Sequence, residues 1–345
     1  MRWDKRAAVA VLITVALSAV ASSQSSTEVL VYRKKYVMGT VFEIAAYDRS
    51  SEHASAAIEK ALEEIVRIDA LLSNYKPESP LSQLNRSVHF HPQRVPPDLY
   101  RVVEEALQFS RLTDGKFDIS VAPWVDLWKA ALSGDAVPSA EQRNRVRSCV
   151  GYEKVELTPP DQITFHSPCL RLDLGAIGKG YAVDRAAEVL RNWGIHDALI
   201  NAGGSTLLAM GAPPGNRAWL LHLRDPSDKL DPQVMLKDQS VSTSEQTPPS
   251  LLGKDSAGHI IDPDTGMPLR TDFAVSVIAK TGTVSDALST SFLLVGPEKG
   301  RVLAGHLENV SAVWISPQAK TEIISGGAQI QFGGERPTAQ PGNIP

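Results

Sequence analysis

Residues 172–194 read LDLGAIGKGYAVDRAAEVLRNWG, an apolar run followed by a glycine-rich turn and a periodic segment. Leu172 and Leu174 flank the charged Asp173, which is the alternation of a half-buried strand. Apolar side chains then recur at helical spacing as far as Gly194, a residue type that commonly ends helices. The stretch predicts a strand, a tight turn and an amphipathic helix, and it leaves a lysine to be explained within the turn.

Glycines and a helix start are suited to holding an anion. Glycine lets the backbone approach a ligand closely, and the first amides of a helix favour negative charge because they have no partner within the helix. The familiar phosphate motifs do not match: a P-loop needs glycine where Asp173 stands and Ser or Thr where Gly180 stands, and G-x-G-x-x-G needs glycine where Val183 stands. Two interpretations stay open, a phosphate site that uses Lys179 and an ordinary turn with a solvated lysine.

Length and charge limit the classes of function. The chain has 345 residues and a formal net charge of −4. This length supports a large core, and the slightly acidic balance indicates no nucleic-acid surface. No repeat is visible and no linker splits residues 30–332, so a single mixed α+β domain is expected there. The tail at 333–345 is rich in Gly and Pro, which predicts disorder.

The N-terminus has the pattern of a signal peptide. The basic start MRWDKR is followed by the apolar run AAVAVLITVALSAVA, which ends in the small-residue sequence Ala19-Val20-Ala21. We expect residues 1–21 to be removed, a Ser-rich linker at 22–29, and a mature protein exported to the periplasm. No cysteine follows the run to carry a lipid. The alternative is that the run stays as an N-terminal anchor.

Two cysteines are present, Cys149 and Cys169. They flank the strand-like runs YEKVEL and QITFH, which a Thr-Pro-Pro-Asp turn separates. A hairpin would bring the two thiols together, and export would permit a disulfide between them. Two buried free thiols are the other interpretation.

Alternation and boundary residues predict further elements. Two strands are expected around Met38-Gly39-Thr40. One helix is expected from about Ser285 to Val295, with Ser285 as its N-cap and Gly296-Pro297 as its end. Other helices are expected at 51–72, 97–112 and 139–149, and other strands at 198–210, 219–226 and 273–280.

The helix after Ser285 carries oxygen donors on one face. Asp286 and Thr290 are four residues apart, so their side chains stack one turn above the other. A carboxylate and a hydroxyl are hard donors suited to Mg²⁺, which takes few protein ligands and completes its shell with water and phosphate. The plainer interpretation is that the aspartate serves the helix dipole and the threonine packs.

The segment GHIIDPDTGMP contains a candidate general base. His259 has an unperturbed pKa near neutrality, and Asp262 is placed to orient it. DPDTG is also a good turn sequence, so His259 would then only cap the turn.

Taken together, these segments resemble the ApbE family of FAD:protein FMN transferases. The matching pieces are VMGTVFEIAAY, LLSNYKPESPLSQLN, TDGKFDISVAPWVDLW, LDLGAIGKGYAVD, ALINAGGS, VSTSE, HIIDPDTG and SDALSTSFLLVG, in the family's order. The resemblance runs from about residue 30 to 332. It implies an α+β fold related to the T-fold and an exported enzyme.

The resemblance also implies the site. Lys179 and Asp173 would contact bound FAD, and Mg²⁺ would be held by the carbonyl of Ala176 and the side chains of Asp286 and Thr290. The remaining FAD contacts implied by matching motifs are Met38, Tyr75, Lys116, Phe117, Asp118, His259 and Ile260.

The implied reaction is Mg²⁺-dependent transfer of the FMN part of FAD. A Thr or Ser hydroxyl of an exported redox protein would attack the FMN phosphorus, with His259 as base and Asp262 beside it, and AMP would leave. Two alternatives are hydrolysis of FAD to FMN and AMP, and a protein that binds or delivers FAD without turnover.

Several positions depart from the family pattern. Gly178 stands where alanine is usual, and Ser205 stands where an acidic or amide residue is common. Glu245 replaces glycine after Thr-Ser, where its charge would oppose a diphosphate. Lys116 replaces a small residue, and we expect it to offset Glu245 if the two loops meet. His259 is the one histidine of its motif.

Overall fold

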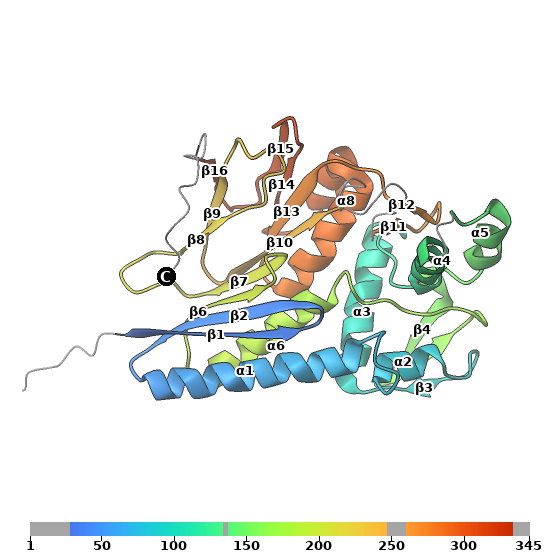
Figure 1. Ribbon diagram of the computed structural model, residues 1–345, viewed down its shortest axis with the longest axis horizontal. Coiled ribbons are helices and arrows are strands. Elements are labelled where there is room, and N and C mark those ends of the chain that lie inside the picture. Colours follow the sequence, from blue (N-terminus) through green and yellow to red (C-terminus); the bar gives the residue numbers. More distant parts are fainter. Residues whose placement is uncertain (1–27, 134–136, 247–259, 334–345) are drawn as a thin grey trace, which may run out of the picture.

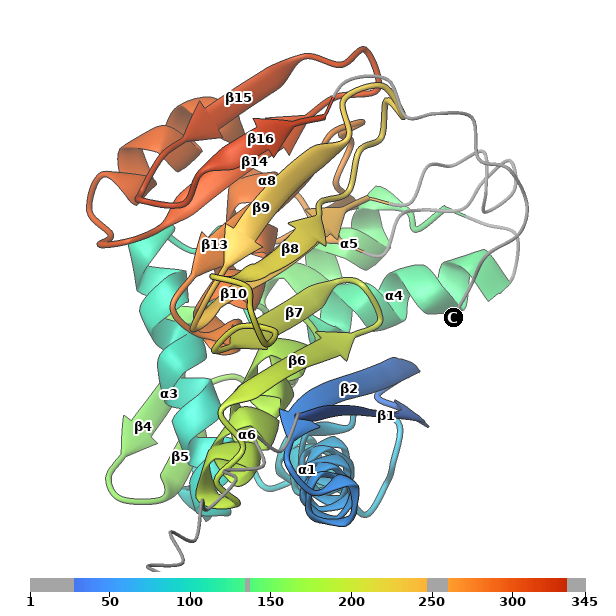
Figure 2. The same cartoon turned by 90° about the vertical axis from the view of Figure 1, so that its left-hand side faces the viewer.

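The computed structural model describes residues 28–133, 137–246 and 260–333. A central antiparallel sheet has the strand order β1-β2-β6-β7-β10-β13-β14-β15 (Figures 1 and 2). Its strands are β1 (Val29–Val37), β2 (Thr40–Asp48), β6 (Asp197–Ala202), β7 (Thr206–Met210), β10 (Gln239–Glu245), β13 (Ala274–Ala279), β14 (Ser311–Ile315) and β15 (Thr321–Ile324). The expected α+β class is confirmed.

Three helices cover one face of this sheet, as Figure 1 shows: α1 (Ser51–Leu72), α6 (Gly178–Asn192) and α8 (Gly282–Ala304). α1 begins where it was predicted because Ser50 caps it, its side chain accepting from the amide of His53. Its apolar stripe, which includes Ile58 and Ile65, is fully buried. Burial of this kind stabilises by roughly 25 cal/mol per Å² of apolar surface.

A smaller sheet covers the opposite face. It has the order β16-β9-β8, from β8 (Trp219–His222), β9 (Pro232–Leu236) and β16 (Ile330–Phe332). Trp219 and Val234 pack there on Val241 and Ile278 of the central sheet. Strands β10 and β13 are therefore buried on both faces, which is why β13 reads AVSVIA without polar alternation.

The rest of the chain lies beside the sheet. It comprises α2 (Pro80–Asn85), β3 (Gln93–Arg94), α3 (Pro97–Leu112), α4 (Ala122–Ser133), α5 (Ala140–Arg147), a 3₁₀ turn (Tyr152–Lys154), β4 (Val155–Thr158), β5 (Gln162–Phe165), β11 (Ile261–Asp262) and β12 (Met267–Pro268). The strands β4 and β5 form the predicted hairpin. Cys149 and Cys169 are joined as a disulfide, which decides between the two interpretations of these cysteines.

An aspartate of each of the helices α6 and α8 accepts hydrogen bonds from backbone amides at the start of the other helix. Asp184 of α6 accepts from the amides of Gly282 and Thr283 of α8, both at 2.7 Å. Asp286 of α8 accepts in return from the amide of Gly180 of α6 at 2.8 Å. Each helix thus supplies the anion that satisfies free amides at the start of the other.

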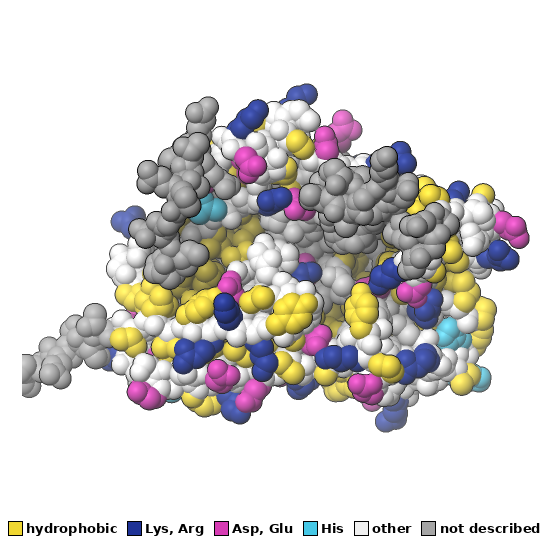
Figure 3. Space-filling model, viewed as in Figure 1, with side chains coloured by type: hydrophobic (Ala, Val, Ile, Leu, Met, Phe, Trp, Pro, Cys, Tyr) yellow, Lys and Arg dark blue, Asp and Glu magenta, His cyan; other side chains and the backbone are white. Residues whose placement is uncertain are grey.

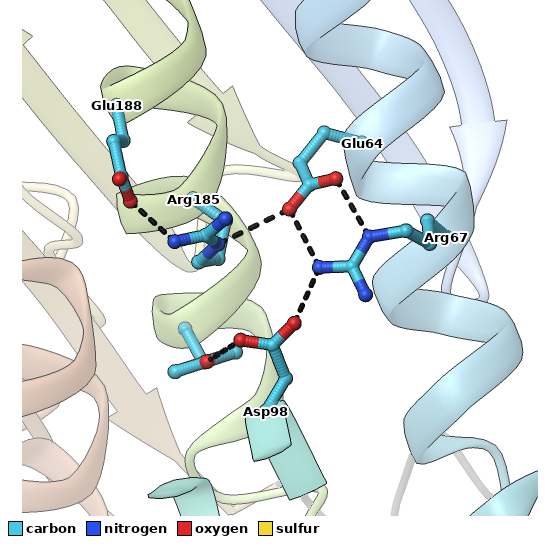
Figure 4. Close-up of polar contacts among 6 residues, drawn as sticks. Glu64, Arg67, Asp98, Arg185 and Glu188 are labelled. Carbon is cyan, nitrogen blue, oxygen red and sulfur yellow. Dashed lines mark hydrogen bonds and ion pairs between the residues drawn. The ribbon is translucent and has the colours of Figure 1, made fainter. Parts of the chain in front are cut away.

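An ion-pair network joins α1, α3 and α6 (Figure 4). Arg67 binds Glu64 through two nitrogens, at 2.7 and 2.8 Å, and reaches Asp98 at 2.6 Å. Arg185 of α6 lies 3.1 Å from Glu64, and the hydroxyl of Tyr181 donates to Asp98 at 2.7 Å. The hydrogen bond from Arg67 lowers the pKa of Glu64. A bidentate arginine shared by several partners fixes the mutual orientation of three helices better than isolated pairs would.

The helix predicted from Ser285 starts earlier than expected. Thr281 is the N-cap, and its hydroxyl accepts from the amide of Val284, whereas the Ser285 hydroxyl donates to the carbonyl of Gly282. The predicted N-cap was therefore wrong by four residues, because hydroxyl residues at 281, 283 and 285 offer alternative caps. Gly296 has φ 76° and interrupts the helix where its end was predicted, and a further helical segment follows.

The surface carries charges of both signs. Figure 3 shows Lys, Arg, Asp and Glu side chains interspersed along the edge where α1 lies, and apolar side chains along the β1–β2 hairpin. Within the described ranges, no helix combines the length and apolarity needed to cross a membrane. The predicted signal peptide at 1–21, most of the linker and nearly all of the tail lie outside these ranges.

Candidate active site

A cavity of about 840 Å³ lies beside the glycine turn that starts α6. This is within the usual size of sites for cofactors and drug-sized ligands. It is lined by segments far apart in sequence, namely Tyr75, Lys116, Phe117, Asp118, Ile119, Val121, Val125, Lys129, Asp173, Gly175, Ala176, Lys179, Gly203, Gly204, Ser205, Arg224, Thr243, Ser244, Glu245, Ile260, Ile261, Pro263, Asp286, Thr290 and Leu294.

Asp286 and Lys179 both line this cavity and interact electrostatically. The Asp286 side chain is almost fully buried, and burial raises its pKa, which the positive charge of Lys179 and the amide of Gly180 counter in part. The amide of Gly180, which the sequence suggested for a phosphate, is instead taken by Asp286 at 2.8 Å. Lys179 also lines the cavity and supplies a positive charge suited to an anionic ligand.

Oxygen donors from three segments line the same cavity. The residues that supply them are Asp286 and Thr290 of α8, Ala176 of the glycine turn and Ser244 of β10. In the part of the chain that the structure describes, no three His, Cys, Asp or Glu side chains cluster as metal ligands. The donor set nevertheless suits Mg²⁺, because this ion accepts one or two carboxylates with neutral oxygens and keeps the rest of its shell for water and phosphate.

Lys116 does not offset Glu245, contrary to the sequence-based expectation. Its ammonium lies 3.0 Å from Asp262 Oδ1 and 2.7 Å from Asp264 Oδ2, and hydrogen bonds to these carboxylates raise its pKa although burial opposes the rise. Glu245 pairs instead with Arg224, whose Nε lies 3.0 Å from its carboxylate. The reason is topological: Arg224 follows β8, which packs over the central sheet near the end of β10.

Ile260 lines the cavity, and its backbone is held by the side chain of Gln246. The side-chain amide of Gln246 donates to the carbonyls of Ile260 and Leu269, both at 3.0 Å, and its oxygen accepts from the amide of Ile260 at 3.2 Å. His259 lies outside the described residues, so its predicted role as base, and that of Asp262 in orienting it, remain predictions.

Asp118 and Phe117 form the wall on the side of α3. The Asp118 carboxylate accepts from the amide of Ser120 at 2.7 Å and from that of Tyr152 at 3.0 Å. Burial raises the pKa of Asp118 to about 6. Phe117 is buried and its ring packs edge-on against Phe109. Asp118 thus holds two loops together at the cavity, and both predicted residues line it.

Tyr75 is an exposed residue that lines the cavity. Its side chain is 82% exposed, its hydroxyl accepts from Lys129 at 3.1 Å, and the Lys129 ammonium lies 4.9 Å from the ring centre. A ring presented in this way is available to stack on a flat ligand. Sequence reasoning missed Lys129, which one turn of α4 places over the tyrosine.

Asp173 lines the cavity, whereas Met38 lies beside the start of α6. Asp173 accepts from the amide of Gly175 at 2.8 Å, which shapes the glycine turn. Met38 adopts φ 52° in the β1–β2 turn, and its methyl group lies beside Gly178. It is not among the described residues that line the cavity. The Ser205 hydroxyl donates to the carbonyl of Ala202, so its proton serves its own turn.

The glycine turn, Lys179 and the α8 donors thus line one cavity. The segments that carry them also match a known family. The ApbE family model matches residues 38–314. The chain belongs to the ApbE family.

Curated relatives and solved structures agree with this assignment. The chain is 30% identical over 321 residues to the FAD:protein FMN transferase of Escherichia coli, covering 87% of this chain and 91% of that protein. It is 29% identical over 318 residues to that of Treponema pallidum, with coverages of 85% and 86%. The flavin transferase ApbE from Vibrio cholerae superposes with a TM-score of 0.75 at 26% identity, covering 87% of this chain and 98% of that one. The ApbE protein of Thermotoga maritima gives 0.74 at 25%, with coverages of 85% and 96%.

Proposed function

We propose that this ApbE-family chain transfers the FMN part of FAD to a Thr or Ser hydroxyl of an exported acceptor protein. FAD and a protein acceptor are named for the relatives in Escherichia coli and Treponema pallidum. One observation in this chain carries the proposal: the oxygen-bearing residues Asp286 and Thr290 of α8 and Lys179 of the α6 turn line one cavity of about 840 Å³.

Mg²⁺ bound by Asp286, Thr290 and the Ala176 carbonyl would neutralise charge on the diphosphate. Lys179 would contact the phosphates as a point charge, since it lines the cavity beside Asp286. Tyr75 would stack on one of the two flat ring systems of FAD. The chain's contribution is thus mainly positioning and charge compensation, as in other phosphoryl transfers.

The bonds exchanged follow from the substrate. The acceptor hydroxyl oxygen forms a bond to the FMN phosphorus, and the bond from that phosphorus to the bridging oxygen breaks, so AMP leaves with the bridging oxygen and its electron pair. The hydroxyl proton passes to a base, for which we propose His259. The product is a phosphoester between FMN and the acceptor.

We further propose that the reaction takes place outside the cytoplasm, in the periplasm. The support is the signal-peptide pattern at 1–21, with its basic start, apolar run and small-residue end. The acceptor would accordingly be an exported redox protein or the exported part of a membrane electron-transfer complex.

The test is an assay of the mature chain with FAD and Mg²⁺, with and without a Thr-containing acceptor peptide. Transfer predicts AMP and a fluorescent peptide adduct only when the peptide is present. AMP without peptide would establish FAD hydrolysis instead, and bound FAD without AMP would establish a carrier. An Asp286→Asn variant should lose AMP formation, and Lys237→Ala, a charge change outside the cavity on the β9–β10 connection, is the control.

A further inference from the structure

The contact between α8 and β10 is built from hydroxyl groups. Ser240, Ser242 and Ser244 alternate along β10, so all three point to the same face of the strand. Ser285 lies 2.9 Å from Ser240 and 2.7 Å from Ser242, and Ser289 lies 2.8 Å from Ser244. Ser240, Ser242, Ser285 and Ser289 are all fully buried. Polar groups kept in such a place must satisfy one another, so the direction of each hydrogen bond is constrained.

The protons can be assigned at the end of this row nearest the cavity. A hydroxyl has one proton and two lone pairs, and a carbonyl can only accept. Ser289 Oγ lies 2.9 Å from the carbonyl oxygen of Asp286, so the Ser289 proton is committed there. The contact between Ser244 and Ser289 at 2.8 Å must then use the Ser244 proton. Ser244 therefore donates to Ser289.

This assignment determines how Thr290 is oriented. Thr290 Oγ1 lies 3.3 Å from Ser244 Oγ, whose proton is already committed, so Thr290 is the donor in that contact. A helical threonine otherwise tends to donate to a carbonyl three or four residues before it, which here would be Asp286 or Ala287. Each of these carbonyls accepts a helical amide and, in addition, a serine hydroxyl, that of Ser289 on Asp286 at 2.9 Å and that of Ser291 on Ala287 at 2.7 Å, so both lone pairs are in use. The Thr290 proton thus points to β10, and its oxygen lone pairs remain for the cavity.

We propose that Ser244, backed by Ser289, is a positioning residue that presents the Thr290 oxygen to a divalent cation. This inference rests on the magnesium site of the proposed function. A cation needs lone pairs and is repelled by a hydroxyl proton, so the donor direction controls whether Thr290 can be a ligand. Partners that orient metal ligands typically change metal affinity by about 10 to 100-fold when removed.

Ser244 itself lines the cavity, so a direct ligand role must be separated from a positioning role. The two roles predict different results when substitutions of Ser244 and Thr290 are combined in one variant. If Ser244 acts through Thr290, its removal has no further effect once the Thr290 hydroxyl is absent. If Ser244 is a ligand, the two losses add. Ser289 gives a second distinction, because it is fully buried and does not line the cavity.

The experiment measures Mg²⁺ binding to the mature chain without FAD, by calorimetry, together with the melting temperature. Ser244→Ala should raise the Mg²⁺ dissociation constant about tenfold, and Ser289→Ala should raise it in the same direction. The double variant Ser244→Ala/Thr290→Val should match Thr290→Val alone. Ser240→Ala is the matched control: it removes a buried hydroxyl of the same strand, which donates to the carbonyl of Leu207, and should lower the melting temperature without changing Mg²⁺ affinity.

Other results overturn the inference in distinguishable ways. Additive losses for Ser244 and Thr290 would make Ser244 a ligand. An unchanged affinity in Ser244→Ala, with wild-type binding intact, would remove the positioning role and leave the proposed function standing. No Mg²⁺ binding by the wild-type chain would refute the metal site of the proposed function itself.

Discussion

Two glycines of the α6 turn should respond in opposite ways to alanine. A Cβ added at Gly180 would lie 2.2 Å from the carbonyl oxygen of Gly282 and 2.7 Å from Asp286 Cβ. At Gly178 the nearest atoms are side-chain carbons of Met38 at 3.6 Å and Leu72 at 3.7 Å, which is ordinary contact. The two positions are two residues apart in one helix, so each is the control for the other.

The magnitudes follow from these contacts. Contacts between carbon atoms are optimal at about 3.5–4.0 Å, so Gly180→Ala must push α8 away from α6 by about 1 Å. Overpacking of this kind costs about 1–3 kcal/mol. Weakening the bond from the Gly180 amide to the Asp286 carboxylate adds about 1.5–3 kcal/mol. Gly178→Ala should instead stabilise by up to about 0.5–1 kcal/mol, because alanine has less backbone freedom to lose in a helix.

Thermal unfolding and FAD binding check both variants. Gly180→Ala should melt several degrees lower than the wild type and bind FAD more weakly, because Asp286 and Lys179 are displaced with the two helices. Gly178→Ala should melt at the wild-type temperature or slightly above it and bind FAD normally. If Gly180→Ala had the same melting temperature and FAD affinity as the wild type, the close crossing of α6 and α8 would not shape the cavity.

Three further outcomes are expected. Arg224→Ala leaves the Glu245 charge unpaired at the cavity and should weaken FAD binding. Arg224→Ala/Glu245→Gly should restore the FAD affinity. Equal FAD affinities in the two variants would contradict a functional role for the Arg224–Glu245 ion pair. The pKa of Asp118 is raised to about 6, so ionisation of this carboxyl lowers the free energy of unfolding by about 3 kcal/mol in total as pH rises from about 4 to 6. The melting temperature of the wild type should fall over this pH range, and that of Asp118→Asn should not show this fall. Parallel pH profiles of melting temperature in the two proteins would argue against the raised pKa. The disulfide closes a loop with a sequence separation of 20 and should stabilise the folded chain by about 3 kcal/mol. The variant Cys149→Ser/Cys169→Ser should therefore melt at a lower temperature than the wild type, and reductant should not change its melting temperature. An unchanged melting temperature in this variant would count against the stabilisation.

Local elements were predictable where the signal is short-range. The turn at Met38 and Gly39 and the helix from Ser51 to Leu72 follow from alternation and helical spacing, and the structure has them at those places. The N-terminus of α8 was misplaced because hydroxyl residues at 281, 283 and 285 are equivalent as caps until Asp184 is known to occupy the amides of Gly282 and Thr283.

Long-range partners were not predictable from local patterns. Nothing near Lys116 in the sequence indicates that its ammonium meets Asp262 and Asp264 rather than Glu245. Arg224 reaches Glu245 only because the small sheet folds over β10. The candidate residues at the cavity were found from motifs, whereas their pairings depend on how strands far apart in sequence are packed.

The exchange of carboxylates between α6 and α8 bears on the order in which the molecule is completed. The aspartate that satisfies the Gly180 amide lies 106 positions later in the chain. During synthesis, residues 178–192 can coil early, but their first turn lacks its anion until the last quarter of the polypeptide is present. We therefore expect a chain truncated before Asp286 to lack the α6–α8 contact that shapes this cavity.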